Sequence, residues 1–166
     1  MKEYKKPSES ETIKTEVVCP NDTNPMGILK GGRLVEWMDI AAAVCAQTHA
    51  ERICVTASIN SVDFYEVAGT GDVITISARM TRSFNTSMEV FVFAFSKNVL
   101  TGKSYLISQA YFTFVALDNN GKATKTIPVK PVTVSEKKRY EEALNRKYKS
   151  AEIKKANEEC INEKAS

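Results

Sequence analysis

Residues 21–43 read NDTNPMGILKGGRLVEWMDIAAA, and this run decides the predicted fold. Its first part is rich in turn-forming residues and ends in the pair Gly31 and Gly32. From residue 33 to about residue 50 the chain has no Pro or Gly, and apolar side chains recur on one helical face. These apolar residues are Leu34, Met38, Ala41, Ala42 and Cys45. We therefore predict that the long helix of the main body begins directly after the two glycines.

Five segments on either side of this helix have the residue pattern of strands. They are 11–18 before the helix and 53–65, 73–82, 87–97 and 105–117 after it. The segment 87–97 is apolar on both faces, and such a strand must be covered twice. One helix covers one face, so we expect another subunit to cover the second. The predicted fold is α+β, with a curved antiparallel sheet wrapped around one central helix.

The end of the chain differs in composition from the main body. Residues 135–163 have the pattern of a charged helix with Ser135 as its N-cap and a thin apolar stripe, which indicates a solvated helix docked on the body. We predict a main domain over residues 8–132 and a helical extension over residues 133–166. The first few residues are polar and are expected to be loosely ordered.

Composition excludes several classes of function. The formal net charge of +3 over 166 residues is too weak to imply a nucleic-acid partner. No stretch approaches the roughly 18 consecutive apolar residues of a membrane span, and the N-terminus lacks the apolar core of a signal peptide. The four cysteines are scattered without a paired metal spacing. We therefore expect reduced thiols, no metal site and a cytoplasmic location.

Asp39 is unusual because it lies within the predicted helix against an alanine-rich stretch. An ionised carboxylate among small apolar residues is costly to bury unless another group pairs with it or a reaction uses it. One interpretation is an ion pair with Arg33 or Arg79. The other is a base that activates water, or a nucleophile, at a carbonyl carbon. Asn24 alone is equally well explained as a turn residue.

Asp39 and Asn24 are more informative when they are considered with the start of the helix. Hydrolysis of an acyl group needs a base, a group that places the water, and donors for the developing oxyanion. Asp39, Asn24 and the backbone N–H groups near Gly31 and Gly32 supply one of each. The single histidine, His49, lies near the helix C-terminus and is expected to be exposed, so a histidine-dependent triad is not predicted.

Several ordered motifs resemble one protein family. The pattern Asp-Thr-Asn, Leu-x-Gly-Gly-x-Leu and Met-Asp is matched at residues 22–24, 29–34 and 38–39, and further similar segments are 55–64, 71–72, 86–90 and 112–118. Over roughly residues 15 to 130 the chain resembles the hotdog-fold acyl-CoA thioesterases of the cytosolic acyl-CoA hydrolase type. It departs from the family pattern at Lys30, where Phe or His is common, and at Asn60, where Asp is frequent.

This resemblance implies a hotdog fold, a homodimer with shared active sites and often a trimer of such dimers. It also implies hydrolysis of acyl-CoA to free fatty acid and CoA, with no cofactor beyond the CoA part of the substrate. By motif position Asp39 is the catalytic base or nucleophile. Asn24, supplied across the dimer interface, orients the water or the carbonyl. Thr86 and Ser87 match a segment near the CoA arm, and Arg82 is a candidate phosphate contact.

Two alternatives to hydrolysis are considered. A non-catalytic acyl-CoA sensor binds thioesters without steady release of thiol, but the presence of Asp39 argues against a dead enzyme. A hotdog dehydratase acting on hydroxyacyl thioesters needs a histidine near the start of the central helix, and His49 lies too far along. In the preferred hydrolase, the acyl chain is expected along the seam between helix and sheet, near Met38 and Ala42.

Overall fold

The computed structural model describes residues 3–165 and contains every helix and strand that the sequence predicts. In chain order the elements are η1 (Pro7–Glu9), β1 (Thr12–Val17), η2 (Pro20–Asp22), α1 (Gly31–Ala50), β2 (Cys54–Phe64), β3 (Val73–Ser83), β4 (Ser87–Lys97), β5 (Ser104–Ala116) and α2 (Val134–Ala165). The helix α1 begins at the glycine pair rather than after it. Its first-turn N–H groups need no partner within the helix, so glycine is tolerated there.

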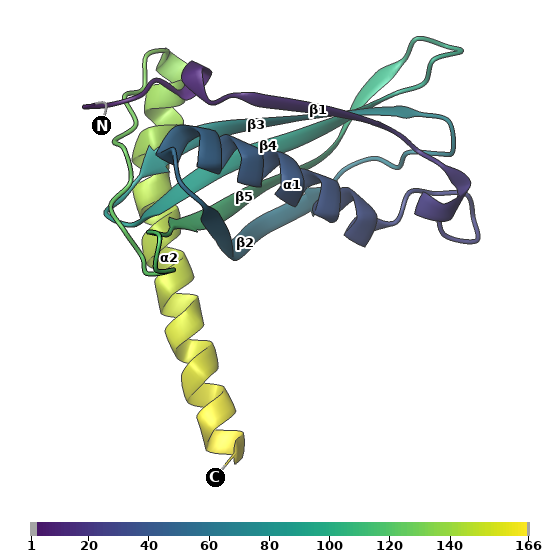
Figure 1. The fold of residues 1–166 in the computed structure, drawn as a ribbon. Coiled ribbons are helices and arrows are strands. Elements are labelled where there is room, and N and C mark those ends of the chain that lie inside the picture. Colours follow the sequence, from purple (N-terminus) through teal and green to yellow (C-terminus); the bar gives the residue numbers. More distant parts are fainter. Residues whose placement is uncertain (1–2, 166) are drawn as a thin grey trace.

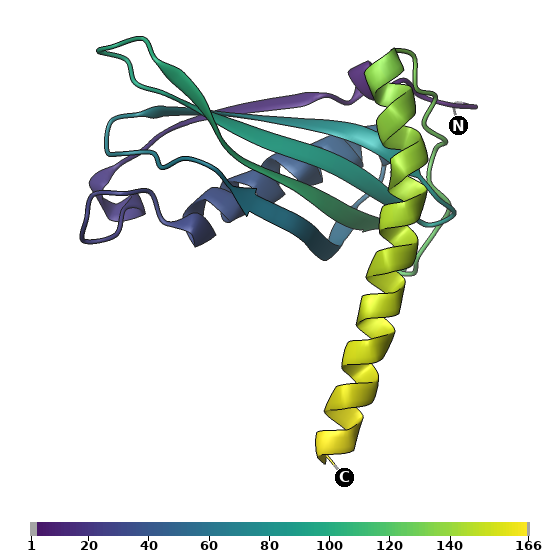
Figure 2. The ribbon, with the colours of Figure 1, turned by 180° about the vertical axis from the view of Figure 1, so that it is seen from behind.

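The five strands form one antiparallel sheet in the order β1-β3-β4-β5-β2. The central pair of β3 and β4 runs from Val73 opposite Lys97 to Ser83 opposite Met88. Figures 1 and 2 show that the sheet curves around α1 on one face, while α2 crosses the strands on the opposite face. The predicted α+β architecture, a curved sheet around one central helix with a C-terminal helix, is therefore confirmed.

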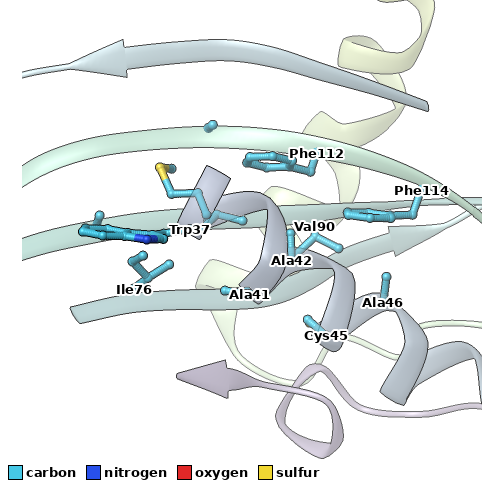
Figure 3. Close-up of a cluster of buried hydrophobic side chains, with 14 of the residues drawn as sticks. Trp37, Ala41, Ala42, Cys45, Ala46, Ile76, Val90, Phe112 and Phe114 are labelled. Atoms are coloured by element: carbon cyan, nitrogen blue, oxygen red, sulfur yellow. The ribbon is translucent and has the colours of Figure 1, made fainter. Parts of the chain in front are cut away.

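The hydrophobic core lies between α1 and the sheet face that curves around it (Figure 3). All five residues of the predicted apolar helix face are buried, together with Trp37 and Ala46. Opposite them the strands contribute Ile76, Val90, Phe112 and Phe114. Full burial of a Phe side chain stabilises a fold by about 1.5–3 kcal/mol. The alanines of α1 are small enough for the helix to approach the sheet closely, so these rings fill the space between them.

The β2 edge of the sheet leaves apolar side chains in water. On this outermost strand Val55, Ile59 and Phe64 are 39–55% exposed, and Ile40 and Val44 of α1 are each 45% exposed. A long edge strand also presents unpaired backbone N–H and C=O groups, which are a template for pairing with another chain. The β2 edge therefore has the properties expected of a subunit interface.

The outer face of the sheet is covered in part by α2 of the same chain. The guanidinium carbon of Arg139 lies 4.6 Å from the centre of the Phe91 ring. Arg146 donates two hydrogen bonds of 2.8 and 3.0 Å to the buried carboxylate of Glu89 and lies 3.9 Å from the centre of the Tyr111 ring. In the first half of β4, around Glu89 and Phe91, this face is covered by α2 of the same chain. The expectation that another subunit covers the face is therefore wrong there.

The helix α2 begins one residue earlier than predicted, at a capping box. The Thr133 hydroxyl accepts a hydrogen bond from the Glu136 N–H at 3.2 Å, and the Glu136 carboxylate accepts one from the Thr133 N–H at 2.9 Å. Thr133 is thus the N-cap, and the assignment of Ser135 to that position is wrong. Residues 151–162 are all exposed, and this end of α2 extends past the β2 edge in Figures 1 and 2.

Among the first residues, Lys5 is held against the end of α1, contrary to the expectation of loose order, whereas residues 1–2 lie outside the described part of the chain. Lys5 is 5% exposed, and its ammonium group donates to the carbonyls of Thr48 and His49 at 2.8 and 3.0 Å. These carbonyls lie in the last turn of α1 and have no partner within the helix. His49 is fully buried, with Nε2 donating to the Ile127 carbonyl at 2.8 Å and Nδ1 lying 3.5 Å from the Ser10 hydroxyl. The prediction of an exposed histidine is therefore wrong.

Three further findings bear on function. Neither α1 nor α2, as far as the described chain extends, combines the length and hydrophobicity that a membrane crossing requires. Residues 3–165 contain no group of three or more His, Cys, Asp or Glu side chains that could hold a metal ion. All four cysteines are free thiols, of which Cys45 and Cys54 are buried and Cys19 and Cys160 are exposed.

Candidate functional site

The loop that precedes α1 is organised around the carboxylate of Asp22. This side chain accepts hydrogen bonds from the Cys19 N–H at 3.0 Å and from Arg33 Nε at 2.8 Å, and Asp22 is only 5% exposed. The Cys19 N–H, followed by the Arg33 guanidinium, lowers the pKa of Asp22. The Asp22 carbonyl also accepts a hydrogen bond from the Lys30 N–H at 3.0 Å. Asp22 therefore holds the loop against the first turn of α1.

Asn24 lies at the turn of this loop, and its amide has a defined orientation. Its Oδ1 atom accepts hydrogen bonds from the N–H groups of Met26 at 3.0 Å and Ile28 at 3.2 Å. Both partners are donors, which assigns the oxygen and the nitrogen of the amide without ambiguity. No described residue accepts a hydrogen bond from Nδ2. Asn24 is thus both a turn residue, as one interpretation predicts, and a side chain whose NH₂ group is available to a ligand.

Asp39 lies in α1 and is half-buried. Its Oδ1 atom accepts a hydrogen bond of 2.8 Å from the Thr56 hydroxyl at the start of β2. Neither Arg33 nor Arg79 pairs with it, because each guanidinium group is bound to other carboxylates. The structural interpretation of Asp39 as an arginine partner is therefore wrong. Over the part of the chain that the structure describes, this carboxylate has a hydroxyl neighbour and no ion pair.

Gly31 and Gly32 occupy the first turn of α1 and serve different purposes. A Cβ atom on Gly31 would lie 3.3 Å from Cζ of Phe64, so glycine permits the end of β2 to pack tightly against the helix start. A Cβ atom on Gly32 would meet nothing within 4 Å. The N-cap residue Lys30 makes no side-chain hydrogen bond to the first turn. The N–H groups of this turn therefore have no side-chain cap, and N–H groups at a helix start favour a negatively charged ligand.

Asn24 and Asp39 do not meet within one chain. Gly31 lies against Phe64 at the end of β2, whereas Asp39 contacts Thr56 near the start of β2. About 12 Å separates Gly31 from Asp39 along the helix axis. The loop that carries Asn24 continues away from this end of α1 (Figure 1). Within one subunit the two side chains therefore lie well apart, with Asp39 beside the start of β2 and the Asn24 loop beyond the start of α1.

A cavity of about 240 Å³ lies between the start of α1 and the end of β2. Its lining is mainly apolar and includes Gly31, Leu34 and Phe64. Met38 and Ala42, the residues predicted to contact an acyl chain, are 0% exposed and are packed in the core. The apolar cavity lies closer to the helix start than these two residues, and the predicted path of the acyl chain along them stays a prediction.

The three residues predicted to contact CoA lie near the start of β4. Ser87 lines a second cavity on the outer face of the sheet. The Thr86 carbonyl accepts a hydrogen bond from the Ala116 N–H at 3.0 Å. Arg82 donates to the Tyr140 carbonyl at 3.1 Å, and its guanidinium lies 4.2 Å from the centre of the Tyr140 ring. The structure therefore gives Arg82 a role in docking α2, and its predicted contact with phosphate stays a prediction.

Comparison with known proteins identifies the family. A family model described as the thioesterase superfamily matches residues 26–103. The Bacillus subtilis protein YkhA, an uncharacterised acyl-CoA thioester hydrolase, is 38% identical over 138 residues, which cover 83% of this chain and 80% of that protein. The human cytosolic acyl coenzyme A thioester hydrolase is 36% identical over 141 residues. That match covers 84% of this chain but 37% of the human protein, so the human protein is much longer than the shared region.

Solved structures agree with this result along almost the whole chain. An acyl-CoA hydrolase from Staphylococcus aureus, in complex with butyryl coenzyme A, coenzyme A and coenzyme A disulfide, matches with a TM-score of 0.90 and 35% identity. The match covers 98% of this chain and 99% of that one. A hexameric acyl-CoA thioesterase in its apo form matches with a TM-score of 0.88 and 39% identity, over 92% of this chain and 97% of that one.

Variants of the Staphylococcus aureus enzyme point to a residue that sequence analysis missed. They replace by alanine an asparagine, an aspartate 15 positions later, and a threonine 17 positions after the aspartate. Asn24, Asp39 and Thr56 have the same spacing in this chain. Thr56 has no local motif to mark it, because only the packing of β2 beside α1 brings it to Asp39. The fold, the ordered motifs and the similarity over most of the chain lead to one conclusion. The chain belongs to the thioesterase superfamily and is a hotdog-fold acyl-CoA thioester hydrolase related to the cytosolic acyl-CoA hydrolases.

Proposed function

We propose that this protein hydrolyses acyl-CoA thioesters at a site shared by two subunits, with Asp39 from one subunit and Asn24 from the other. The state of these two side chains carries the proposal. Among the described residues Asp39 is held by the Thr56 hydroxyl without a neutralising cation, and Asn24 has its oxygen fixed and its NH₂ group available. A carboxylate that acts as a base must be able to accept a proton, which a paired cation would oppose. An amide that stabilises an oxyanion must have its NH₂ group available to donate a hydrogen bond.

The β2 edge supplies the geometry for a shared site. Two edge strands that pair antiparallel about a two-fold axis place the start of one strand beside the end of the other. Asp39 and Thr56 lie at the start of β2, and the loop that carries Asn24 lies beyond its end. Pairing of two β2 strands therefore brings Asp39 of one subunit toward Asn24 of the partner subunit. The same pairing removes the exposed apolar side chains of the β2 edge from water.

The proposed chemistry uses groups that these two subunits already present. The thioester carbonyl oxygen accepts hydrogen bonds from Asn24 Nδ2 and from the N–H groups at the start of α1, which stabilise the oxyanion. Asp39 either removes a proton from water as the water oxygen attacks the carbonyl carbon, or attacks that carbon itself to form an anhydride that water opens. Collapse of the tetrahedral intermediate breaks the C–S bond and releases the CoA thiolate. In the first route the thiolate takes up the proton that Asp39 removed from water. In the second route the water that opens the anhydride supplies this proton. Thr56 orients Asp39 throughout.

The apolar cavity beside Gly31 and Phe64 is the proposed site of the acyl chain. It lies at the helix start, where the carbonyl must also lie to receive the N–H groups. For the assembly we propose dimers formed by the β2 edge and a trimer of such dimers, since a hexameric relative resembles this chain over most of its length. A stable monomer of 18.4 kDa that hydrolyses thioesters contradicts the shared site.

Mixed dimers test the shared site directly. Asn24→Ala and Asp39→Asn are each expected to lower thioester turnover strongly as homodimers. In a mixed dimer, one site has both substitutions and the other has neither. Unfolding and refolding the two variants together is therefore expected to restore activity, up to about a quarter of the wild-type value for random pairing. The measurement is thiol release from butyryl-CoA.

Two controls make the mixed-dimer result decisive. Each variant refolded alone is expected to stay inactive, and circular dichroism checks that both have recovered their structure. If Asn24 and Asp39 act within one subunit, mixing restores nothing, and the shared site is excluded. Binding of butyryl-CoA by wild-type protein without steady release of thiol excludes hydrolysis altogether and supports a sensor instead.

A further inference from the structure

The cavity proposed for the acyl chain is open on one side and closed on the other. Phe64, Glu66 and Val67 form its rim, and all three side chains are exposed. Ala68 and Ile107 also line it, but they are only 3% and 1% exposed, so they form its floor. A chain that enters past Phe64 therefore meets packed side chains after a limited length.

The cavity also ends within the first turn of α1. Gly31 and Leu34 of this helix line it, and they lie about one turn apart. The helix contributes no lining residue after Leu34. One turn further along the buried side, Met38 is 0% exposed and belongs to the hydrophobic core. The cavity is therefore a short pocket at the helix start and does not continue along α1.

Backbone hydrogen bonds hold the floor of the cavity in place. The Leu29 N–H donates to the Ala68 carbonyl at 2.9 Å, which ties the floor to the loop before α1. The Tyr65 N–H donates to the Ile107 carbonyl at 2.9 Å, which ties the segment after β2 to β5. Closely packed protein interiors also have low compressibility. The floor therefore does not retreat before a chain that is too long for the cavity.

The chemistry and the size of the cavity suit an unsubstituted hydrocarbon chain of moderate length. Glu66, at the rim, is the charged residue among the nine that line it, and the other eight are apolar or glycine. The floor therefore offers no side-chain partner for a polar group on the chain. An apolar cavity of about 150 Å³ in another protein holds one benzene molecule. In proportion, a volume of about 240 Å³ holds roughly eight carbon atoms of a saturated chain.

We propose that Ala68 and Ile107 determine acyl-chain specificity by limiting the chain to about eight carbons. The proposal rests on the proposed thioester hydrolysis and deepens it, because it names the substrate class as CoA thioesters of short and medium-length saturated fatty acids. Up to this limit, each further CH₂ group leaves water for the cavity. Beyond it, the fixed floor pushes the thioester carbonyl away from the N–H groups at the start of α1, so turnover falls.

A series of chain lengths on the wild-type protein tests the limit. The substrates are straight saturated acyl-CoA thioesters from acetyl-CoA to palmitoyl-CoA, each below the concentration at which it forms micelles. The measurement is kcat/KM from thiol release. We expect kcat/KM to rise by up to about fourfold for each added CH₂ until the chain has about eight carbons. From there to palmitoyl-CoA we expect a decline of about tenfold or more.

Two substitutions of opposite effect test the residues of the floor. Ala68→Val narrows the cavity and is expected to lower the kcat/KM ratio of octanoyl-CoA to butyryl-CoA about tenfold. Ile107→Val removes one methyl group and is expected to raise the ratio of decanoyl-CoA to octanoyl-CoA about fourfold. The matched control is Ile127→Val, the same change at an equally buried position outside the cavity lining, which is expected to keep both wild-type ratios. A loss of stability alone lowers activity on every chain and leaves the ratios unchanged.

The outcomes separate this proposal from the proposed function. If kcat/KM keeps rising to palmitoyl-CoA, or if Ile107→Val keeps the same ratios as Ile127→Val, the chain-length limit is overturned while hydrolysis stands. Ile107→Val decides the role of the floor even where Ala68→Val does not fold. Absence of thiol release at every chain length overturns the proposed function instead. Calorimetry with the same thioesters then tests the limit, since affinity that still increases between octanoyl-CoA and palmitoyl-CoA excludes it and affinity that stops increasing supports it.

Discussion

Asp22 and Asp39 belong to the same stretch of loop and helix, but their surroundings differ in burial, hydrogen bonding and charge. Asp22 is buried, accepts a backbone N–H and pairs with Arg33, and its pKa is lowered by these contacts. Asp39 is half-buried and is held by the Thr56 hydroxyl without an ion pair among the described residues. Asp22 shapes the loop, whereas Asp39 retains an oxygen that a reaction can use.

This difference shows that two carboxylates of one motif can have separate roles, one in stability and one in catalysis. A carboxylate whose hydrogen-bonding capacity is satisfied within the protein stabilises the fold and has little left for a substrate. A carboxylate placed by one hydroxyl keeps acceptor capacity, because an ionised carboxylate can accept several hydrogen bonds. The comparison therefore predicts that substitutions at Asp22 affect stability and that substitutions at Asp39 affect turnover.

The largest effect is expected from Asp39→Asn. Loss of the base or nucleophile is expected to lower kcat by about 10²–10⁴, since general acid–base catalysis contributes rate factors of that size. The amide has the same shape and can still accept the hydrogen bond from Thr56, so the melting temperature is expected to stay close to the wild-type value. Thiol release from butyryl-CoA and thermal unfolding measure the two quantities. Turnover within tenfold of wild type removes Asp39 from the mechanism.

A smaller effect is expected from Thr56→Ala. Removing the hydroxyl leaves Asp39 without its positioning contact, and loss of one hydrogen bond to a charged group, about 1.5 kcal/mol, corresponds to roughly tenfold in kcat. Thr56→Ser keeps the hydroxyl and is expected to recover most of the activity, which separates positioning from packing. Steady-state kinetics of both variants provide the check. Equal kcat for the Ala and Ser variants shows that the hydroxyl has no role.

Asp22→Asn is expected to lower stability rather than turnover. Arg33 loses its charged partner, so the melting temperature is expected to fall by several degrees at pH 7 while kcat stays within a few-fold of wild type. The pKa of Asp22 is below its ordinary value of 3.8 in the fold, so its contribution is present above that pH and is lost at lower pH. The unfolding curves of both proteins are therefore expected to begin to converge as the pH falls below 3.8 and to meet only at the lower pH where Asp22 of the folded protein is protonated. A difference that persists there contradicts the assigned role of the charge.

The smallest expected effect is on the pH dependence of stability and comes from His49, a buried titratable side chain. Burial, opposed by the hydrogen bond to Ile127, lowers its pKa below the ordinary value of 6.5. The unfolded chain then binds a proton that the folded chain resists, so stability is expected to decline as the pH falls below about 6.5. His49→Gln, which can still donate to Ile127, is expected to flatten this decline between pH 7 and 5 in thermal unfolding. An unchanged slope excludes His49 as its source.

Much of the fold is predictable because its determinants are local. The glycine pair, the stretch without breakers after it and the alternation along β3 specify their elements within a few residues of chain. The N-cap Thr133 is also a local determinant, but Ser135, two residues later, is an equally good N-cap residue by type, so the sequence alone did not identify the cap. The interaction that decides the start of α2 is the return contact from Glu136 to the Thr133 N–H.

The rest of the site depends on contacts between distant segments. His49 is buried by Lys5 and Ser10 on one side and by Ile127 on the other, and no pattern around the helix end indicates these partners. Thr56 reaches Asp39 only through the packing of β2 beside α1. The convergence of Asn24 with Asp39 requires a second subunit, so one sequence suggests it only through the family resemblance.

The cysteines have a practical consequence for any assay that detects released CoA with a disulfide reagent. Burial raises the pKa of Cys45 to about 12 and that of Cys54 to about 11, so neither forms the reactive thiolate at neutral pH. Cys19 and Cys160 are exposed and will consume the reagent along with the product. Because the Cys19 N–H also anchors the Asp22 loop, labelling at that position can disturb the enzyme during its own measurement. Replacing Cys19 and Cys160 by serine gives a protein whose colour change reports catalysis alone.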